Sequence, residues 1–196
     1  MQLILGIAQG VGLSCAVGVR PFIAGVAVNI FASEDFFVNF SGTDYAFLES
    51  STFLVVMIAL LVITGIMQRR MGPETFERGP LGAAMAGVGI GLGAIFFAAS
   101  LADFGYTSWP GLIAGILCAA LAQVVSRGVF AGAAARLDKQ ARKALVFYKE
   151  WTVLILAVLA MVIPPISYLF LAFLIWLFIA NRRRKSDKYA GLRILR

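Results

Sequence analysis

Two arginines, Arg20 and Arg127, are the side chains of this sequence best suited to bind an anion. A guanidinium group stays charged at neutral pH, and its planar set of N–H donors matches a carboxylate or a phosphate. Both arginines lie inside long apolar segments, whereas the other 15 Lys and Arg residues fall in the polar stretches 68–79, 135–149 and 181–196. A charged side chain inside a membrane costs about 2.5–3.5 kcal/mol on insertion scales, so these two positions predict a functional site.

The residues around the two arginines follow a common pattern. Residues 17–27 read Val-Gly-Val-Arg-Pro-Phe-Ile-Ala-Gly-Val-Ala, and residues 124–134 read Val-Val-Ser-Arg-Gly-Val-Phe-Ala-Gly-Ala-Ala. This repetition predicts a duplicated site with two-fold symmetry. Pro21 should break the first helix, because proline cannot donate the backbone hydrogen bond. The glycines of both copies should let backbone and substrate approach closely; they are Gly18, Gly25, Gly128 and Gly132.

Three further polar side chains are candidate members of this site. Gln123 precedes Arg127 by one helical turn and is expected to orient its guanidinium. Glu49 and Glu150 precede two apolar segments at matching positions, where each could pair with an arginine or favour a helix N-terminus electrostatically. In the alternative interpretation, each arginine pairs with a carboxylate or a helix carbonyl, or extends to the membrane interface, and has only a structural role.

The composition is that of a membrane protein. Of the 196 residues, 61% are hydrophobic and 14% are charged, and the mean hydropathy is +0.90, which is too apolar for a soluble domain. The net charge of +7 does not indicate nucleic-acid binding, because the basic residues flank apolar segments. The sequence has no His and only two Cys, Cys15 and Cys118. We therefore expect no metal, no cofactor and no enzymatic acid–base chemistry.

Long apolar stretches and short charged ones divide the chain. The apolar stretches are 3–32, 51–67, 80–102, 109–134 and 151–180. The polar stretches 33–50 and 103–108 contain no Lys or Arg, which predicts that they face away from the cytoplasm, while the basic stretches face it. Because 151–180 then has two cytoplasmic ends, it should be a hairpin that turns at Pro164-Pro165. One long kinked helix is the alternative.

These assignments predict an all-α integral membrane protein, a single domain over 1–196. It would have six membrane segments and both termini in the cytoplasm, in the bacterial inner membrane. Repeat one covers about 1–102 and repeat two about 109–181 in inverted topology, followed by a basic cytoplasmic tail at 182–196. Such 3+3 inverted repeats are typical of secondary transporters, whose binding site lies at the repeat interface. Broken or re-entrant helices are expected near Pro21 and near Pro164-Pro165.

The sequence also resembles a known family. The resemblance rests on Gly18-Val19-Arg20-Pro21-Phe22, on Glu150, on the apolar span with prolines and its basic exit, and on the ending Lys188-Tyr189-Ala190-Gly191-Leu192-Arg193. In these features, and over most of its length, the chain resembles the bacterial membrane family called domain of unknown function 4126. The resemblance implies no established activity, substrate or site. Ala often follows the arginine in that family, so Pro21 is expected to make the helix break sharper here.

Two functions from different classes follow from these residues. The first is a transporter or flippase-like protein whose arginines bind a small anion or a lipid phosphate. The second is a membrane scaffold or assembly partner in which the arginines form structural pairs with carboxylates. An enzyme is less consistent with so few acid–base groups. Expected partners are membrane lipids, including anionic ones, and an anionic substrate; whether the chain forms a homo-oligomer is left open, and no nucleic acid is expected.

Overall fold

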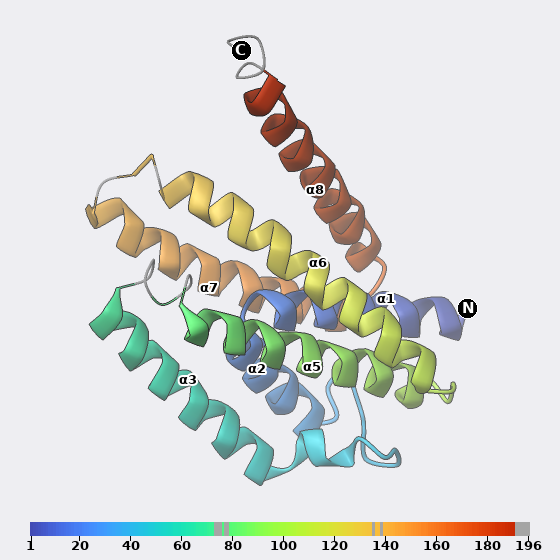
Figure 1. Cartoon of the computed structure of the whole chain (residues 1–196). Coiled ribbons are helices and arrows are strands. Elements are labelled where there is room, and N and C mark those ends of the chain that lie inside the picture. The colour runs from blue at the N-terminus through green and yellow to red at the C-terminus, as the bar shows by residue number, and fades with distance from the viewer. Residues whose placement is uncertain (73–75, 77–78, 135, 138, 191–196) are drawn as a thin grey trace.

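The computed structural model describes residues 1–72, 76, 79–134, 136–137 and 139–190 (Figure 1). Within these residues the chain is helical and has no strand, which confirms the predicted all-α class. The elements are α1 (Gln2–Val19), α2 (Pro21–Ser33), the 3-10 helix η1 (Ala46–Glu49), α3 (Ser51–Met71), α5 (Pro80–Asp103), α6 (Trp109–Ala134), α7 (Lys139–Val162) and α8 (Ile166–Ala190).

Four of these helices, α1, α3, α5 and α6, are long and apolar enough to cross a membrane. The prediction of a membrane protein with apolar helices is therefore supported at this level, whereas six membrane segments are not confirmed.

Helix α1 is the centre of the bundle. Two-thirds of its residues are buried, and it packs against α5, α6, α7 and α8. Small residues make this packing possible: Ser14 donates a hydrogen bond to the Gly93 carbonyl of α5 at 2.7 Å. Gly18 lies so close to α6 that a Cβ on it would be 2.5 Å from the carbonyl oxygen of Ala119. Close contact through small residues is a common way for helices to associate in membranes.

The bundle has two ends of opposite charge. At the basic end, α3 finishes with the exposed Arg69 and Arg70, α5 begins, and Arg136 follows α6. The acidic end holds the segment 33–50 and the last residue of α5, Asp103, whose carboxylate accepts a hydrogen bond from the Asn39 backbone at 3.5 Å. The predicted separation of basic and acidic loops therefore corresponds to the two ends of the helix bundle.

A helix break at Arg20 separates α1 from α2, as Pro21 predicts. Arg20 has an extended backbone (φ −146°, ψ 91°), and Pro21 occupies the first position of α2. Proline suits this position because its missing N–H would have no partner in the first turn. The break lies beside Gly89 of α5 and Ala119 of α6, near the middle of both helices.

After this break the chain turns back toward the end of the bundle from which it came. The side chain of Gln9, in the first half of α1, donates to the Phe37 carbonyl beyond α2 at 3.1 Å. Asn29, near the end of α2, donates to the Ser50 carbonyl just before α3 at 3.3 Å. Helices α1 and α2 therefore form a hairpin that enters and leaves the bundle at its acidic end (Figure 1). Residues 3–32 were expected to cross the membrane once.

Helices α7 and α8 form the second hairpin, which turns at Pro164-Pro165. Lys149 of α7 lies over the ring of Phe130, and Asn181 of α8 lies beside Gly128, so both arms return to the same end of α6. This reversal agrees with the predicted hairpin and not with one long kinked helix.

The start of α1 and the C-terminal part of α8 lie toward opposite ends of the bundle. Tyr168, at the start of α8, donates to the Ile4 carbonyl at 2.8 Å, which places the start of α1 beside the turn between α7 and α8. Arg182 lies at the other end, where α6 finishes. The expectation that both termini face the cytoplasm is therefore not confirmed, because the bundle alone does not show which of its ends faces the cytoplasm.

The two arginine segments also differ in structure. Arg20 occupies a break between two helices, whereas Arg127 lies within the uninterrupted α6. The residue after each arginine accounts for this difference, because Pro21 cannot continue a helix and Gly128 can. The 3+3 inverted repeat, with repeat one at about 1–102 and repeat two at about 109–181, is not confirmed.

Candidate functional site

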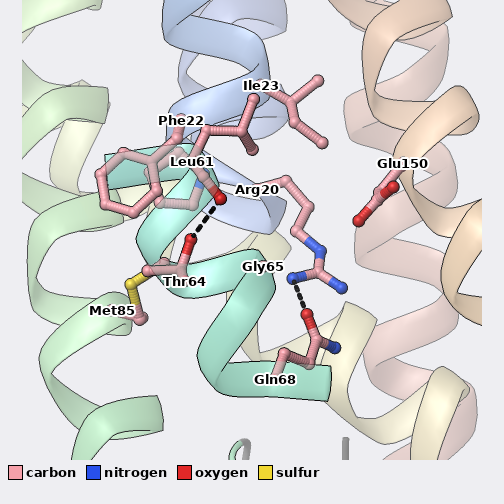
Figure 2. Close-up of a pocket in the computed structure, with 10 residues that line it drawn as sticks. Arg20, Phe22, Ile23, Leu61, Thr64, Gly65, Gln68, Met85 and Glu150 are labelled. Carbon is pink, nitrogen blue, oxygen red and sulfur yellow. Dashed lines mark hydrogen bonds between the residues drawn. The ribbon is translucent and has the colours of Figure 1, made fainter. Parts of the chain in front are cut away.

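The tip of the α1–α2 hairpin presents Arg20 to the basic half of the bundle. Its guanidinium donates to Oε1 of Gln68 at 3.2 Å, three residues before the end of α3 (Figure 2). Its backbone N–H still donates to the Ala16 carbonyl at 3.1 Å, so the first helix is complete up to the arginine. The break therefore fixes the direction of the arginine side chain.

Arg20 forms part of the wall of a small cavity of about 30 Å³. Gln68 and Glu150 line the same cavity, and Figure 2 shows the Glu150 carboxylate on the far side of the guanidinium from α3. The remaining lining residues are mostly apolar: Pro21, Phe22, Ile23, Leu61, Thr64, Gly65 and Met85. The prediction that Glu150 belongs to the arginine site is consistent with this position.

Gln123 holds the second arginine, as its position one turn earlier predicts. With its amide oriented by the surrounding groups, its oxygen accepts from Arg127 Nε at 3.0 Å and from Nη2 at 3.2 Å. Its amide nitrogen then donates to the Gly18 carbonyl at the end of α1. Arg127 also donates to the Gly82 carbonyl of α5. Gln123 therefore joins the second arginine to the hairpin tip.

Both arginines, together with Lys149, line a second cavity of about 40 Å³. Lys149 is only 6% exposed, and its Nζ lies 4.9 Å from the centre of the Phe130 ring, a cation–π contact. The sequence does not point to this lysine, because it is the last residue of the basic stretch 135–149, which is predicted to be cytoplasmic. Its place directly before Glu150 was the one available signal.

The two cavities adjoin, since Arg20, Pro21 and Met85 line both of them. Their described walls contain three cationic side chains and one carboxylate, Glu150. The N-terminus of α2 begins in the same place, and its free N–H groups add partial positive charge. This region of the bundle therefore favours an anion electrostatically.

The size of the cavities limits what can bind. A volume of 30–40 Å³ is enough for a few water molecules. Pockets for drug-sized ligands are about ten times larger, roughly 300–1,000 Å³. In this conformation the site suits a small inorganic anion, or one carboxylate or phosphate group of a larger molecule.

Other predicted members lie elsewhere. Glu49 is at the acidic end, where its carboxylate accepts from the Phe40 backbone N–H, so the structure does not bring it together with Glu150 at the arginines. A Cβ on Gly132 would meet no atom within 4 Å, so no close approach occurs there. Gly25 packs against Met57, with 3.2 Å between the Met57 sulfur and an added Cβ. Glu49, Gly25 and Gly132 therefore do not line either of the two cavities.

Gly128 has a different neighbour from the one predicted. Although it follows Arg127, it faces α8, where an added Cβ would lie 3.1 Å from Nδ2 of Asn181. Pro164 and Pro165 form the turn between α7 and α8, where the Pro164 carbonyl accepts from the Ser167 N–H at 3.0 Å. The prolines shape the fold and do not line either cavity.

Comparisons with family models, with curated proteins and with solved structures found no match for this chain. The resemblance to domain of unknown function 4126, which rests on residues 18–22 and 188–193 among others, therefore stays a prediction.

Proposed function

We propose that this protein binds a small anion within the membrane, and that it belongs to the transporter or flippase-like class. The observation that supports this best is the convergence of Arg20, Arg127 and Lys149 on adjoining cavities at the tip of the α1–α2 hairpin. Cations this far inside a bundle of apolar helices are costly, and such positions commonly mark ion or substrate pathways.

The hairpin itself supports transport over simple binding. Broken helices that stop within a membrane are found in transporters, where helix ends line the substrate site. Backbone outside a regular helix is tolerated at that depth only where protein buries it or a water-filled cavity adjoins it. Arg20 meets both conditions, since it is partly buried and lines two cavities.

The charge distribution supports an orientation. We place the basic end in the cytoplasm of a bacterium and the acidic end outside the inner membrane, because Lys and Arg mark cytoplasmic loops. The arginine cavities would then lie in the cytoplasmic half of the membrane, at the blind end of a hairpin that enters from outside. This orientation of the bundle requires neither six membrane segments nor an inverted repeat.

A specific observation favours a second candidate, a scaffold with structural arginines. Arg127 already donates to the Gly82 carbonyl and to Gln123, so part of its hydrogen-bonding capacity is used within the protein. In this alternative the guanidinium ties α5 and α6 to the end of α1. Replacing it would then destabilise the bundle and leave no anion-binding defect to measure.

A titration of thermal stability distinguishes these candidates. The purified protein in detergent would be titrated with sodium phosphate or sodium acetate at constant ionic strength. A ligand at 100 times its Kd stabilises by about 2.7 kcal/mol, which a shift of the midpoint temperature Tm reports. We expect this shift in the wild type, and we expect Arg20→Gln and Arg20→Lys to lose most of it while remaining folded.

The matched control is Arg69→Gln, which removes an exposed arginine at the basic end that lines neither cavity. It should keep the full anion-dependent shift. A shift that is absent in the wild type, or equal in Arg20→Gln and Arg69→Gln, would contradict anion binding at this site. If the shift depends on Arg20 as expected, uptake of labelled phosphate or acetate into proteoliposomes would distinguish transport from binding alone.

A further inference from the structure

A second site lies on the outside of the bundle, between α6 and α8. Helix α8 leans away from α6 toward its C-terminal end (Figure 1). A cavity of about 110 Å³ is lined by residues of both helices. Its lining residues are Val124, Val125, Gly128, Phe178, Asn181 and Arg182. None of these residues lines the two arginine cavities.

The lining is apolar at one end and cationic at the other. Val124 is 57% exposed, the partly exposed Phe178 extends the apolar surface, and the buried Val125 lies behind them. At the basic end Arg182 is exposed, and its guanidinium carbon lies 5.5 Å from the centre of the Phe178 ring. This distribution matches a molecule with an anionic head and an apolar chain.

Gly128 allows Asn181 to reach the groove. Because it has no side chain, the amide of Asn181 can lie directly against α6, with Nδ2 3.1 Å from where a Cβ would be. Asn181 and Arg182 then present neutral and charged N–H donors at the same end of the groove. The sequence pattern groups Gly128 with the neighbouring Arg127, but Gly128 faces α8 whereas Arg127 donates to the Gly82 carbonyl of α5.

We propose that this groove binds an anionic phospholipid of the leaflet at the basic end. The lipid phosphate accepts hydrogen bonds from Arg182 and Asn181, and an acyl chain lies along Val124 and Phe178. The occupant is a lipid because the groove opens at the start of the basic segment Arg182-Arg183-Arg184-Lys185, which the sequence places after the last apolar residues. Basic residues at that boundary attract anionic headgroups.

Native mass spectrometry of the detergent-solubilised protein tests this site. The probe is dioleoylphosphatidylglycerol, with dioleoylphosphatidylcholine as the zwitterionic comparison. We expect the wild type to retain the anionic lipid preferentially. Arg182→Gln should weaken retention about five-fold, as for the loss of one cation near a membrane surface. Gly128→Leu, which fills the groove, should displace the lipid while Arg182 remains.

The control is Arg136→Gln, which removes an exposed arginine at the same end of the bundle that lies outside the groove. It should leave retention unchanged. Equal losses in Arg182→Gln and Arg136→Gln would show general attraction to the basic end and would overturn the site. Equal retention of both lipids, or a wild-type protein that retains neither lipid, would also overturn it. If Gly128→Leu does not fold, the two arginine variants still decide the outcome.

Discussion

Replacing Gly18 by Ala tests how closely the hairpin tip is packed against α6. An added Cβ would lie 2.5 Å from the carbonyl oxygen and 2.7 Å from the Cα of Ala119. These are backbone atoms of a long helix, so they cannot move aside as the end of a flexible side chain can. Overpacking of this kind costs about 1–3 kcal/mol. The greater helix propensity of Ala recovers roughly 0.5–1 kcal/mol of it.

We therefore expect Gly18→Ala to lower the free energy of unfolding by about 1–2 kcal/mol. For a domain of this size, that loss corresponds to a fall in Tm of roughly 2–8 °C. Scanning fluorimetry of tryptophan emission in detergent, at one fixed heating rate, measures the difference. The altered tip should also weaken stabilisation by phosphate, because the Gly18 carbonyl accepts the hydrogen bond from Gln123.

Gly132→Ala is the matched control, since a Cβ at Gly132 meets no atom within 4 Å. It should leave Tm unchanged or raise it slightly, because Ala favours a helix over Gly. If Gly18→Ala is as stable as Gly132→Ala, α1 does not approach α6 at this point. The position of the hairpin tip would then be wrong.

Three further predictions concern the charges of the site and the direction of the hairpin. Glu150→Gln should tighten phosphate binding, since removing a negative charge about 8 Å from the anion is worth about 2 kcal/mol at an effective dielectric of 20; unchanged affinity, as expected for Glu49→Gln, would contradict a shared cavity. Lys149→Met removes the positive charge but leaves an apolar side chain of similar length. It should weaken phosphate binding about ten-fold without loss of folding, and full affinity would exclude Lys149 from the site. In a cysteine-free chain, an impermeant maleimide should label Gln2→Cys from outside whole cells and Arg136→Cys only after permeabilisation; the opposite result for Gln2→Cys would remove the re-entrant hairpin.

Local chemistry made part of this structure predictable. Pro21 could not continue α1, and Pro164-Pro165 marked the reversal between two segments with basic ends. Gln123 and Arg127 are one helical turn apart, so their contact followed from helix geometry alone. In each case the information lay within a few residues of the feature.

The return of α2 to the acidic end depends on contacts between distant residues, and the sequence could not show it. A 30-residue apolar segment with a break fits a kinked crossing and a hairpin equally well. The hydrogen bond from Gln9 to the Phe37 carbonyl joins residues 28 positions apart. The matching positions of Glu49 and Glu150 before two apolar segments did not predict their neighbours for the same reason, because tertiary packing determines which residues surround each carboxylate.

The central claim is that the hairpin tip binds an anion between Arg20 and Arg127. Crystals grown in sodium bromide would test it most directly, because bromide is a small anion that anomalous scattering locates. We predict a bromide peak in the cavity lined by Arg20, Arg127 and Lys149, and its loss in Arg20→Gln. Bromide bound only at the protein surface, with water alone in that cavity, would contradict the claim.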